Sequence, residues 1–132
     1  MSQAYLLHVC CSDVIKRRTV LSKVFVPQIP RRRDKTTDKF IPVVNVSPAE
    51  EYGEIVVLLP PTASFHATGD IVDLLRPQLK QYSYEDGDSV IAIGDPSILA
   101  VVLGILGREH GKFYLLKWDR LMQRYNKSKI IL

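Results

Sequence analysis

Residues 89–116 read SVIAIGDPSILAVVLGILGREHGKFYLL, and this stretch decides the fold. It begins with a short apolar run, residues 89–93, which is typical of a strand buried on both faces. Gly94-Asp95-Pro96 follows, and supplies a carboxylate suited to an N-cap and a proline suited to the first helical position. Residues 98–106 are apolar on nearly every side, and a second strand pattern starts at Lys112. The stretch therefore predicts a strand, a central helix and a parallel strand joined by a right-handed crossover.

The residues before this stretch extend the same alternation. Residues 54–59 form a continuous apolar run that predicts another core strand, after one helical turn capped by Ser47. The spacing of apolar residues over 68–82 predicts a helix, which Pro77 is expected to kink or divide. Strands and helices in this order predict an α/β domain with a small mixed, largely parallel sheet (a βαβαβ core plus antiparallel edge strands). Two main helices, 68–82 and 96–109, are expected to pack on that sheet.

The two ends of the domain are expected to add antiparallel strands at the edges of the sheet. Residues 23–26 form a strand pattern, and residues 31–39 are too polar to bury, so we expect a hairpin loop or arm there. Residues 40–46 resemble an edge strand because Pro42 cannot donate a backbone hydrogen bond. The last strand is expected over about residues 121–125.

Length and composition indicate a single folded domain. The chain has 132 residues, of which 46% are hydrophobic and 24% charged, so a fully disordered or disulfide-built protein is excluded. The domain is expected over residues 23–132, after a poorly patterned N-terminal extension over residues 1–22. The two cysteines, Cys10 and Cys11, are adjacent and offer no disulfide framework, which favours a reducing compartment. With neither a secretory leader nor a membrane span in the pattern, we expect a cytoplasmic protein.

The net charge of +4 is unevenly distributed along the chain. Residues 1–39 carry +6, residues 40–111 carry −7 and residues 112–132 carry +5. Basic ends with interleaved aromatic residues are compatible with nucleic-acid binding. The alternative is a solvated sheet edge whose lysines block aggregation and whose aromatic residues belong to the core. The candidate nucleic-acid contacts are Arg31, Arg32, Arg33, Lys117, Arg120 and Arg124.

The best candidate pocket lies at the predicted strand-to-helix junction. Open α/β sheets bind ligands outside the carboxyl ends of their strands, which is where Gly94, Asp95, Pro96 and Ser97 are expected. The alternative is plain cap and turn chemistry, because the Asp95 carboxylate would occupy the amides that an anion needs.

No other pattern supplies a catalytic or metal centre. Acidic residues surround one predicted strand but lack the spacing of a calcium loop, and the three histidines are scattered. No nucleophile-elbow motif accompanies the serines. We therefore predict no catalytic residue, no metal and no cofactor. The acidic residues are Glu85, Asp86, Asp88 and Asp95.

Several short motifs resemble, in order and spacing, a family of small uncharacterised proteins encoded by bacteriophages. The resemblance covers about residues 23–125 and implies a phage origin and a host-cytoplasm setting, without supplying catalytic residues. The motifs are Val24-Phe25-Val26-Pro27-Gln28, Arg32-Arg33-Asp34, Ser47-Pro48-Ala49-Glu50-Glu51-Tyr52-Gly53-Glu54, Gly94-Asp95-Pro96, and Leu116-Lys117-Trp118-Asp119-Arg120 followed by Tyr125.

Three functions are weighed for such a domain. The first is a non-enzymatic binding module that acts through a host or phage protein partner, using edge strands or the junction at residues 94–97. The second is a nucleic-acid-binding protein that uses the basic arm and the basic C-terminal segment. The third is a small nucleotide-using or metal-dependent enzyme centred on Gly94, Asp95 and the acidic loop. The sequence leaves the oligomeric state open.

Overall fold

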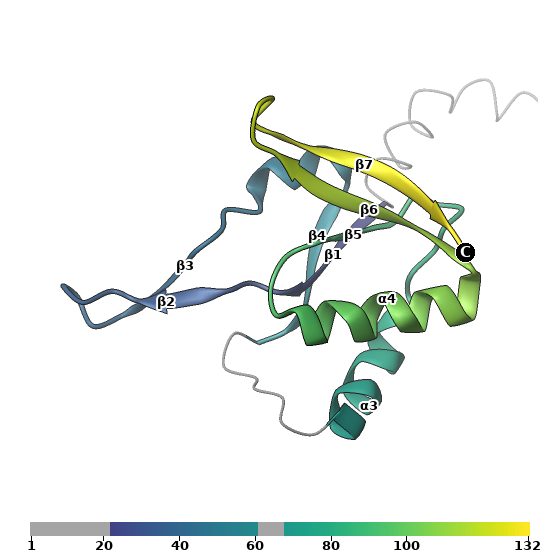
Figure 1. The fold of residues 1–132 in the computed structure, drawn as a ribbon, viewed down its shortest axis with the longest axis horizontal. Helices are drawn as coiled ribbons and strands as arrows, with labels where there is room; N and C mark the ends of the chain where they lie inside the picture. The colour runs from purple at the N-terminus through teal and green to yellow at the C-terminus, as the bar shows by residue number, and fades with distance from the viewer. Residues whose placement is uncertain (1–21, 61–67) are drawn as a thin grey trace, which may run out of the picture.

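A computed structural model describes residues 22–60 and 68–132. Its main sheet has five strands in the order β4-β1-β5-β6-β7 (Figure 1). The first four strands are parallel, and β7 pairs antiparallel with β6. The predicted α/β domain with a mixed, largely parallel sheet is therefore confirmed. The strands are β1 (Lys23–Gln28), β4 (Glu54–Leu59), β5 (Ser89–Ile91), β6 (Lys112–Asp119) and β7 (Arg124–Ile131).

Two α-helices cover one face of this sheet. They are α3 (Thr68–Leu79) and α4 (Pro96–His110), close to the two predicted helices, 68–82 and 96–109. The Asp95 carboxylate accepts a hydrogen bond of 2.8 Å from the backbone N–H of Ser97 and caps α4. The larger hydrophobic core lies between the helices and the sheet. It includes Phe25, Leu58, Ile71, Leu75, Leu79, Val90, Ile98, Val102, Leu106 and Phe113.

A short 3-10 helix, η1 (Ser47–Tyr52), lies on the opposite face. It covers a smaller core, and the hydroxyl of Tyr52 donates a hydrogen bond of 2.7 Å to the carbonyl of Tyr125. Along the strand order, the connection from β1 to β4 moves in one direction, and the connections through α3 and α4 move in the other. Because parallel crossovers are right-handed, η1 in the first connection lies on the face opposite the two α-helices. The smaller core contains Val24, Val26, Ala49, Ile91, Leu116 and Tyr125.

A separate two-stranded sheet projects from the domain (Figure 1). It consists of β2 (Arg31–Arg33) and β3 (Phe40–Pro42), which pair antiparallel. We call residues 31–42 the arm. Its turn is held by Asp34, whose carboxylate accepts hydrogen bonds from the backbone N–H of Thr36 and the hydroxyl of Thr37.

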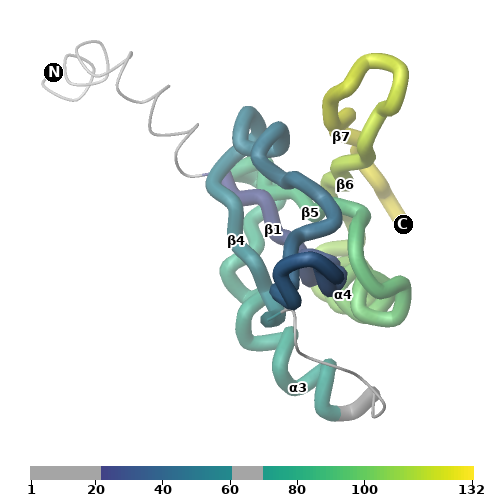
Figure 2. Tube along the Cα trace, turned by 90° about the vertical axis from the view of Figure 1, so that its left-hand side faces the viewer, coloured from purple at the N-terminus to yellow at the C-terminus, as the bar shows by residue number. Residues whose placement is uncertain are grey.

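The positions of three strands differ from the prediction. Residues 23–26 belong to β1, which lies between β4 and β5 and pairs parallel with both, so it is no antiparallel edge. Residues 40–42 pair within the arm rather than at the edge of the main sheet. β4, predicted as a core strand, ends the sheet instead (Figure 2). The cause is topological, because the chain leaves β1 for the outside position and then returns past β1 to form β5.

Three local predictions are corrected as well. Pro77 lies in the last turn of α3 and does not divide the helix. Val46 rather than Ser47 occupies the N-cap of η1. The last strand begins at Arg124 and not at residue 121, because the residues before it form a turn. In that turn, the Asp119 carboxylate accepts hydrogen bonds from two consecutive backbone N–H groups.

Some predictions fall on parts of the chain that are not described. Residues 1–21 of the predicted N-terminal extension, with Cys10 and Cys11, lie outside the described residues. Ser22 is described, and it is tied to the domain: its hydroxyl donates a hydrogen bond to the carbonyl of Asp86, and its carbonyl accepts one from Glu54. Over residues 22–60 and 68–132, no helix is long and apolar enough to span a membrane.

Candidate interaction surface at the carboxyl edge of the sheet

The fold brings all the predicted site residues to one end of the sheet. The arm follows the carboxyl end of β1, residues 94–97 follow that of β5, and the β6–β7 turn follows that of β6. Parallel strands end at the same edge, so these three segments share it (Figure 1, left). We call this end the carboxyl edge.

The junction at residues 94–97 lies beside the carboxyl ends of the neighbouring strands β1 and β5. The connection after β1 leads to η1 on one face of the sheet, and the connection after β5 leads to α4 on the other face. This is the usual place for a ligand in an open α/β sheet. Gly94 has φ +93°, and a Cβ added there would lie 2.8 Å from the carbonyl oxygen of Gln28. Asp95 caps α4 through Ser97, as the sequence allows. The two strand ends are thus in close contact, and ligand binding at Gly94, Asp95, Pro96 and Ser97 stays a prediction.

The arm carries its arginines in solvent. Arg31, Arg32 and Arg33 are all exposed. Arg33 pairs with Asp38 across the hairpin, with its Nε donating at 2.6 Å, whereas neither Arg31 nor Arg32 forms an ion pair within the described residues. The N–H of Thr36 holds the pKa of the Asp34 carboxyl below its ordinary value, so that carboxylate stays ionised. The arm therefore presents two unpaired guanidinium groups.

The arm also presents apolar surface. The side chain of Phe40 is 65% exposed, and Val43, just after the arm, is exposed as well. A groove of about 420 Å³ lies at the base of the arm and is lined mainly by apolar side chains. Its lining residues are Ile29, Pro42, Val43, Val44, Asn45 and Val46.

A second projection is the β6–β7 tip, residues 117–124. Leu121 is 94% exposed, and Met122 beside it is exposed too. Lys117, Arg120 and Arg124 belong to the same segment, so the tip combines exposed apolar and basic residues. Arg124 lies 3.7 Å from the Glu51 carboxylate of η1. The tip is preorganised by Asp119, whose pKa is held below its ordinary value, chiefly by the Met122 N–H.

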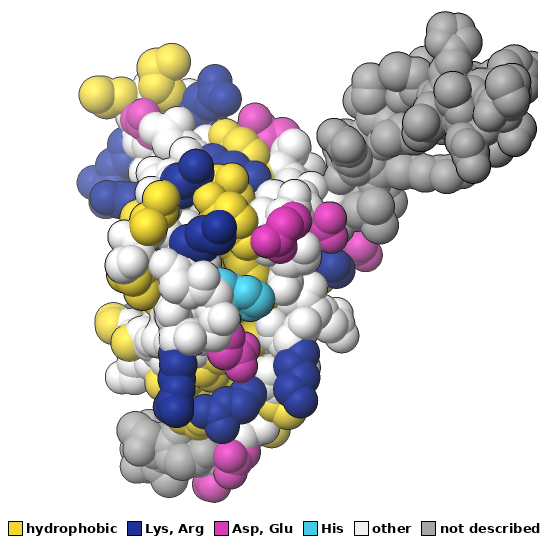
Figure 3. Space-filling model, turned by 90° about the vertical axis from the view of Figure 1, so that its right-hand side faces the viewer, with side chains coloured by type: hydrophobic (Ala, Val, Ile, Leu, Met, Phe, Trp, Pro, Cys, Tyr) yellow, Lys and Arg dark blue, Asp and Glu magenta, His cyan; other side chains and the backbone are white. Residues whose placement is uncertain are grey.

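The interleaved basic and aromatic residues noted in the sequence form a cluster with Tyr84 at the other end of β6, which was not predicted. The rings of Tyr84 and Tyr114 stack with centroids 4.6 Å apart. The Nζ atom of Lys112 lies 4.5 Å from the ring centroid of Tyr84, and the Nζ atom of Lys127 lies 4.5 Å from that of Tyr114. Figure 3, which views the molecule from its right-hand side in Figure 1, shows lysine and arginine side chains interleaved with hydrophobic ones.

This cluster is better explained as packing than as a base-binding platform. A nucleic-acid base needs a free ring face, and both outer faces of the tyrosine pair are covered by ammonium groups. Lys127 is further held by its hydrogen bond of 2.7 Å to the carbonyl of Gly87. No local sequence signal marks this cluster, because it depends on the register of β6 and β7, which sets Tyr114 opposite Lys129 and Leu116 opposite Lys127 on one face.

The acidic residues around β5 do not converge. Asp88 precedes the strand and is fully buried, and its carboxylate accepts hydrogen bonds from the backbone N–H groups of Lys23 and Ser83. Asp95 follows the strand at the opposite end. Within the described ranges, no three His, Cys, Asp or Glu side chains are grouped so that they could hold a metal ion. His8, Ser64 and His66 lie outside those ranges.

The comparison with known proteins points to a phage family. The family model described as "Phage Pam3 gp32-like protein" matches residues 22–132. The match supports the phage-family resemblance noted in the sequence, and it begins at the same residue as the described domain. No curated protein matches the chain, and no solved structure does.

Proposed function

We propose that this chain, which belongs to the Phage Pam3 gp32-like protein family, is a non-enzymatic binding protein that acts through a protein partner. It would act in the cytoplasm of the infected host cell. The contact surface is the carboxyl edge, with the arm and the β6–β7 tip as its two projections.

The observation that carries this proposal is the projecting arm. A hairpin of two three-residue strands is marginal in water unless another surface covers it. The arm nevertheless exposes Phe40, and an apolar groove lies at its base. Exposed apolar surface rimmed by polar groups marks protein contact sites. Leu121 and Met122 present the same chemistry at the tip.

Capture of partners from phage-infected cells tests the proposal. The tagged chain is crosslinked in the cells and compared with an arm variant, Phe40→Ser with Val43→Ser, and with a tip variant, Leu121→Ser with Met122→Ser. Leu74→Ser on α3 is the matched control, because Leu74 is 52% exposed and lies away from the carboxyl edge. Circular dichroism verifies that each variant is folded.

We expect a stoichiometric protein to be recovered with the wild type and the control, and to be lost with the arm variant. Equal recovery with all variants, or no stoichiometric protein with the wild type, would refute the proposal.

Nucleic-acid binding is the second candidate, and the exposed arginines favour it. Arg31, Arg32 and Arg33 stand on a projection, and Lys117, Arg120 and Arg124 lie at the same edge. Phosphate contacts predict a binding constant that falls steeply with salt. Filter binding to single- and double-stranded DNA and RNA at two salt concentrations tests this.

The triple variant Arg31→Ala, Arg32→Ala, Arg33→Ala is expected to reduce both the affinity and the salt dependence. Arg76→Ala with Arg108→Ala, two exposed arginines on the helices, is the control and should bind like the wild type. Absence of binding even at low salt would end this alternative.

A further inference from the structure

The outer edge of β4 is open, although its sequence is that of a central strand. Among the described strands, β4 pairs only with β1, so its other edge has no partner. Five of its six residues are apolar, and the side chain of Val57 is 42% exposed. Edge strands usually carry charges that discourage further pairing. β7, at the opposite edge, follows that rule with Lys127 and Lys129, whereas β4 has only Glu54 at its start.

The arm offers a strand edge that could pair there. Two backbone hydrogen bonds bracket its ladder: Val43 N–H donates to Pro30, and Asp34 N–H donates to Lys39. Because bonded and non-bonded pairs alternate in an antiparallel ladder, the N–H and C=O groups of Arg31 and Arg33 point away from β3. The outer edge of β3 lacks a donor at Pro42. Among the described strands nothing pairs with this edge of β2, which is therefore the edge equipped for a further strand.

The charges of these two surfaces are complementary. Residues 31–39 carry five basic and two acidic side chains, a net charge of +3. Residues 47–54, which form η1 and the start of β4, carry three glutamates and no basic residue, a net charge of −3. Glu50, Glu51 and Glu54 are all exposed.

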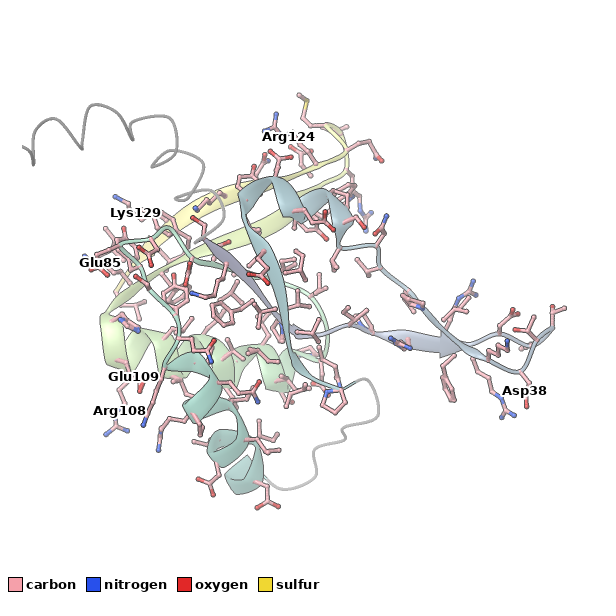
Figure 4. All side chains as sticks on the ribbon, turned by 180° about the vertical axis from the view of Figure 1, so that it is seen from behind. Asp38, Glu85, Arg108, Glu109, Arg124 and Lys129 are labelled. Carbon is pink, nitrogen blue, oxygen red and sulfur yellow. The ribbon has the colours of Figure 1, made fainter. Side chains whose placement is uncertain are left out.

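One chain cannot bring these surfaces together. The arm leaves the carboxyl end of β1, whereas Glu54 begins β4 beside the amino end of β1. Figure 4 shows Asp38 at the far end of the arm, well away from η1 and from Arg124. Figure 2 shows β4 at the outside of the sheet.

We propose that β2 of one copy adds to the open edge of β4 in a second copy, with the arm arginines against Glu50 and Glu54. This inference rests on the proposed function and identifies the protein partner of the arm as a second copy of the chain. Main-chain hydrogen bonds between β2 and β4 supply the pairing. Because the two surfaces differ, the contact is head-to-tail and generates a ring or an open filament.

A charge exchange between the two surfaces tests the contact. The arm-reversed variant is Arg31→Glu with Arg32→Glu, which spares the Arg33–Asp38 pair. The edge-reversed variant is Glu50→Arg with Glu54→Arg, which spares the Glu51–Arg124 pair. Sedimentation velocity over a concentration series measures the assembly of the full chain, of each variant alone and of their equimolar mixture.

We expect the wild type to assemble with increasing concentration and each variant alone to be monomeric. The mixture should assemble again, because each reversed surface then finds its complement on the other variant. Asp70→Arg with Asp73→Arg on α3 makes the same charge change as the edge reversal at another site, and should leave assembly intact.

Other outcomes separate this inference from the proposed function. A wild type that stays monomeric at every concentration, or a mixture that fails to assemble, overturns the inference. If the arm is still needed to capture a different protein from infected cells, the proposed function stands although the self-assembly inference fails. If the full chain is monomeric but deletion of residues 1–21 induces assembly, the inference is overturned and the edge is assigned to the chain's own N-terminal segment.

Discussion

Gly94 sets the spacing between β1 and β5 at the carboxyl edge. Its φ of +93° suits glycine, and a Cβ would lie 2.8 Å from a backbone oxygen, that of Gln28. We expect Gly94→Ala to lower the free energy of unfolding by about 1–3 kcal/mol, measured by urea denaturation. Gly104→Ala is the control: no atom lies within 4 Å of its added Cβ, and a helical alanine should stabilise by about 0.5–1 kcal/mol. An unchanged stability for Gly94→Ala would contradict the close contact between the two strand ends.

Asp88 is a buried acidic residue whose titration is coupled to folding. Burial raises the pKa of its carboxyl above the ordinary value, against the opposing effects of two backbone N–H groups and Lys23. A raised pKa means that the native state binds the proton more tightly than the unfolded state. Stability from this group therefore grows as the pH falls through the native pKa, and is lost as the pH rises.

We expect the wild type to gain stability relative to Asp88→Asn as the pH is lowered from 7 to the ordinary aspartate pKa of 3.8. The quantity compared is the free energy of unfolding of the wild type minus that of the variant. Urea denaturation at a series of pH values measures this difference. A difference that is constant or shrinks on acidification would contradict the burial of an ionised carboxylate at this position.

Among the elements, α3 has one buried face and one exposed face, and the two should contribute differently to stability. Leu75 is fully buried against α4 and the sheet, while its neighbour Leu74 is 52% exposed. We expect Leu75→Ala to cost about 2–5 kcal/mol because it leaves a cavity in the larger core. Leu74→Ala removes the same atoms at the surface and should change the stability by less than about 0.5 kcal/mol. Equal costs, measured by urea denaturation, would contradict the packing of α3.

The helices and most of the strands could be predicted because their signals are local. Asp95 and Pro96 mark the start of α4, and the apolar period of α3 and α4 marks the faces that they bury. The place of each strand in the sheet is not a local property. β4 has the composition of a central strand, and only the route of the chain from β1 and back to β5 puts it at the edge.

The candidate surface likewise has some features that follow from local sequence signals and others that depend on tertiary contacts. The exposed arm follows from the run of charges at residues 31–39, which no core could accept. The Tyr84–Tyr114 stack could not be predicted, because it joins a loop residue to a strand residue through tertiary structure. Lys127 covers one of these rings only because of the β6–β7 register. Contacts between distant residues therefore decide which predicted cations stay free.

Across the whole molecule, the uneven charge of the sequence separates the basic arm from the acidic residues of η1 and β4. The arm projects its arginines away from the glutamates of residues 50–54, whereas at the β6–β7 tip Arg124 lies 3.7 Å from Glu51. A molecule with separated charges of opposite sign can recognise its own copies head-to-tail or a partner of either sign. The charge exchange described above distinguishes these outcomes.

The two hydrophobic cores indicate how far the domain extends along the chain. Both hydrophobic cores are composed of residues between 24 and 125, and the family match starts at residue 22. We expect deletion of residues 1–21, which keeps the hydrogen bonds of Ser22, to shift the Tm by only a few degrees, corresponding to under about 1 kcal/mol. Thermal unfolding followed by circular dichroism measures the shift.

The matched terminal control is deletion of residues 124–132, which removes β7 and with it the buried ring of Tyr125. That deletion uncovers the smaller core on the η1 face and exposes the paired edge of β6, so it should abolish cooperative unfolding. If loss of residues 1–21 caused aggregation or a comparable fall in Tm, the segment would belong to the core. The domain would then begin before residue 22, and the open edge of β4 would be the first place to look for its contact.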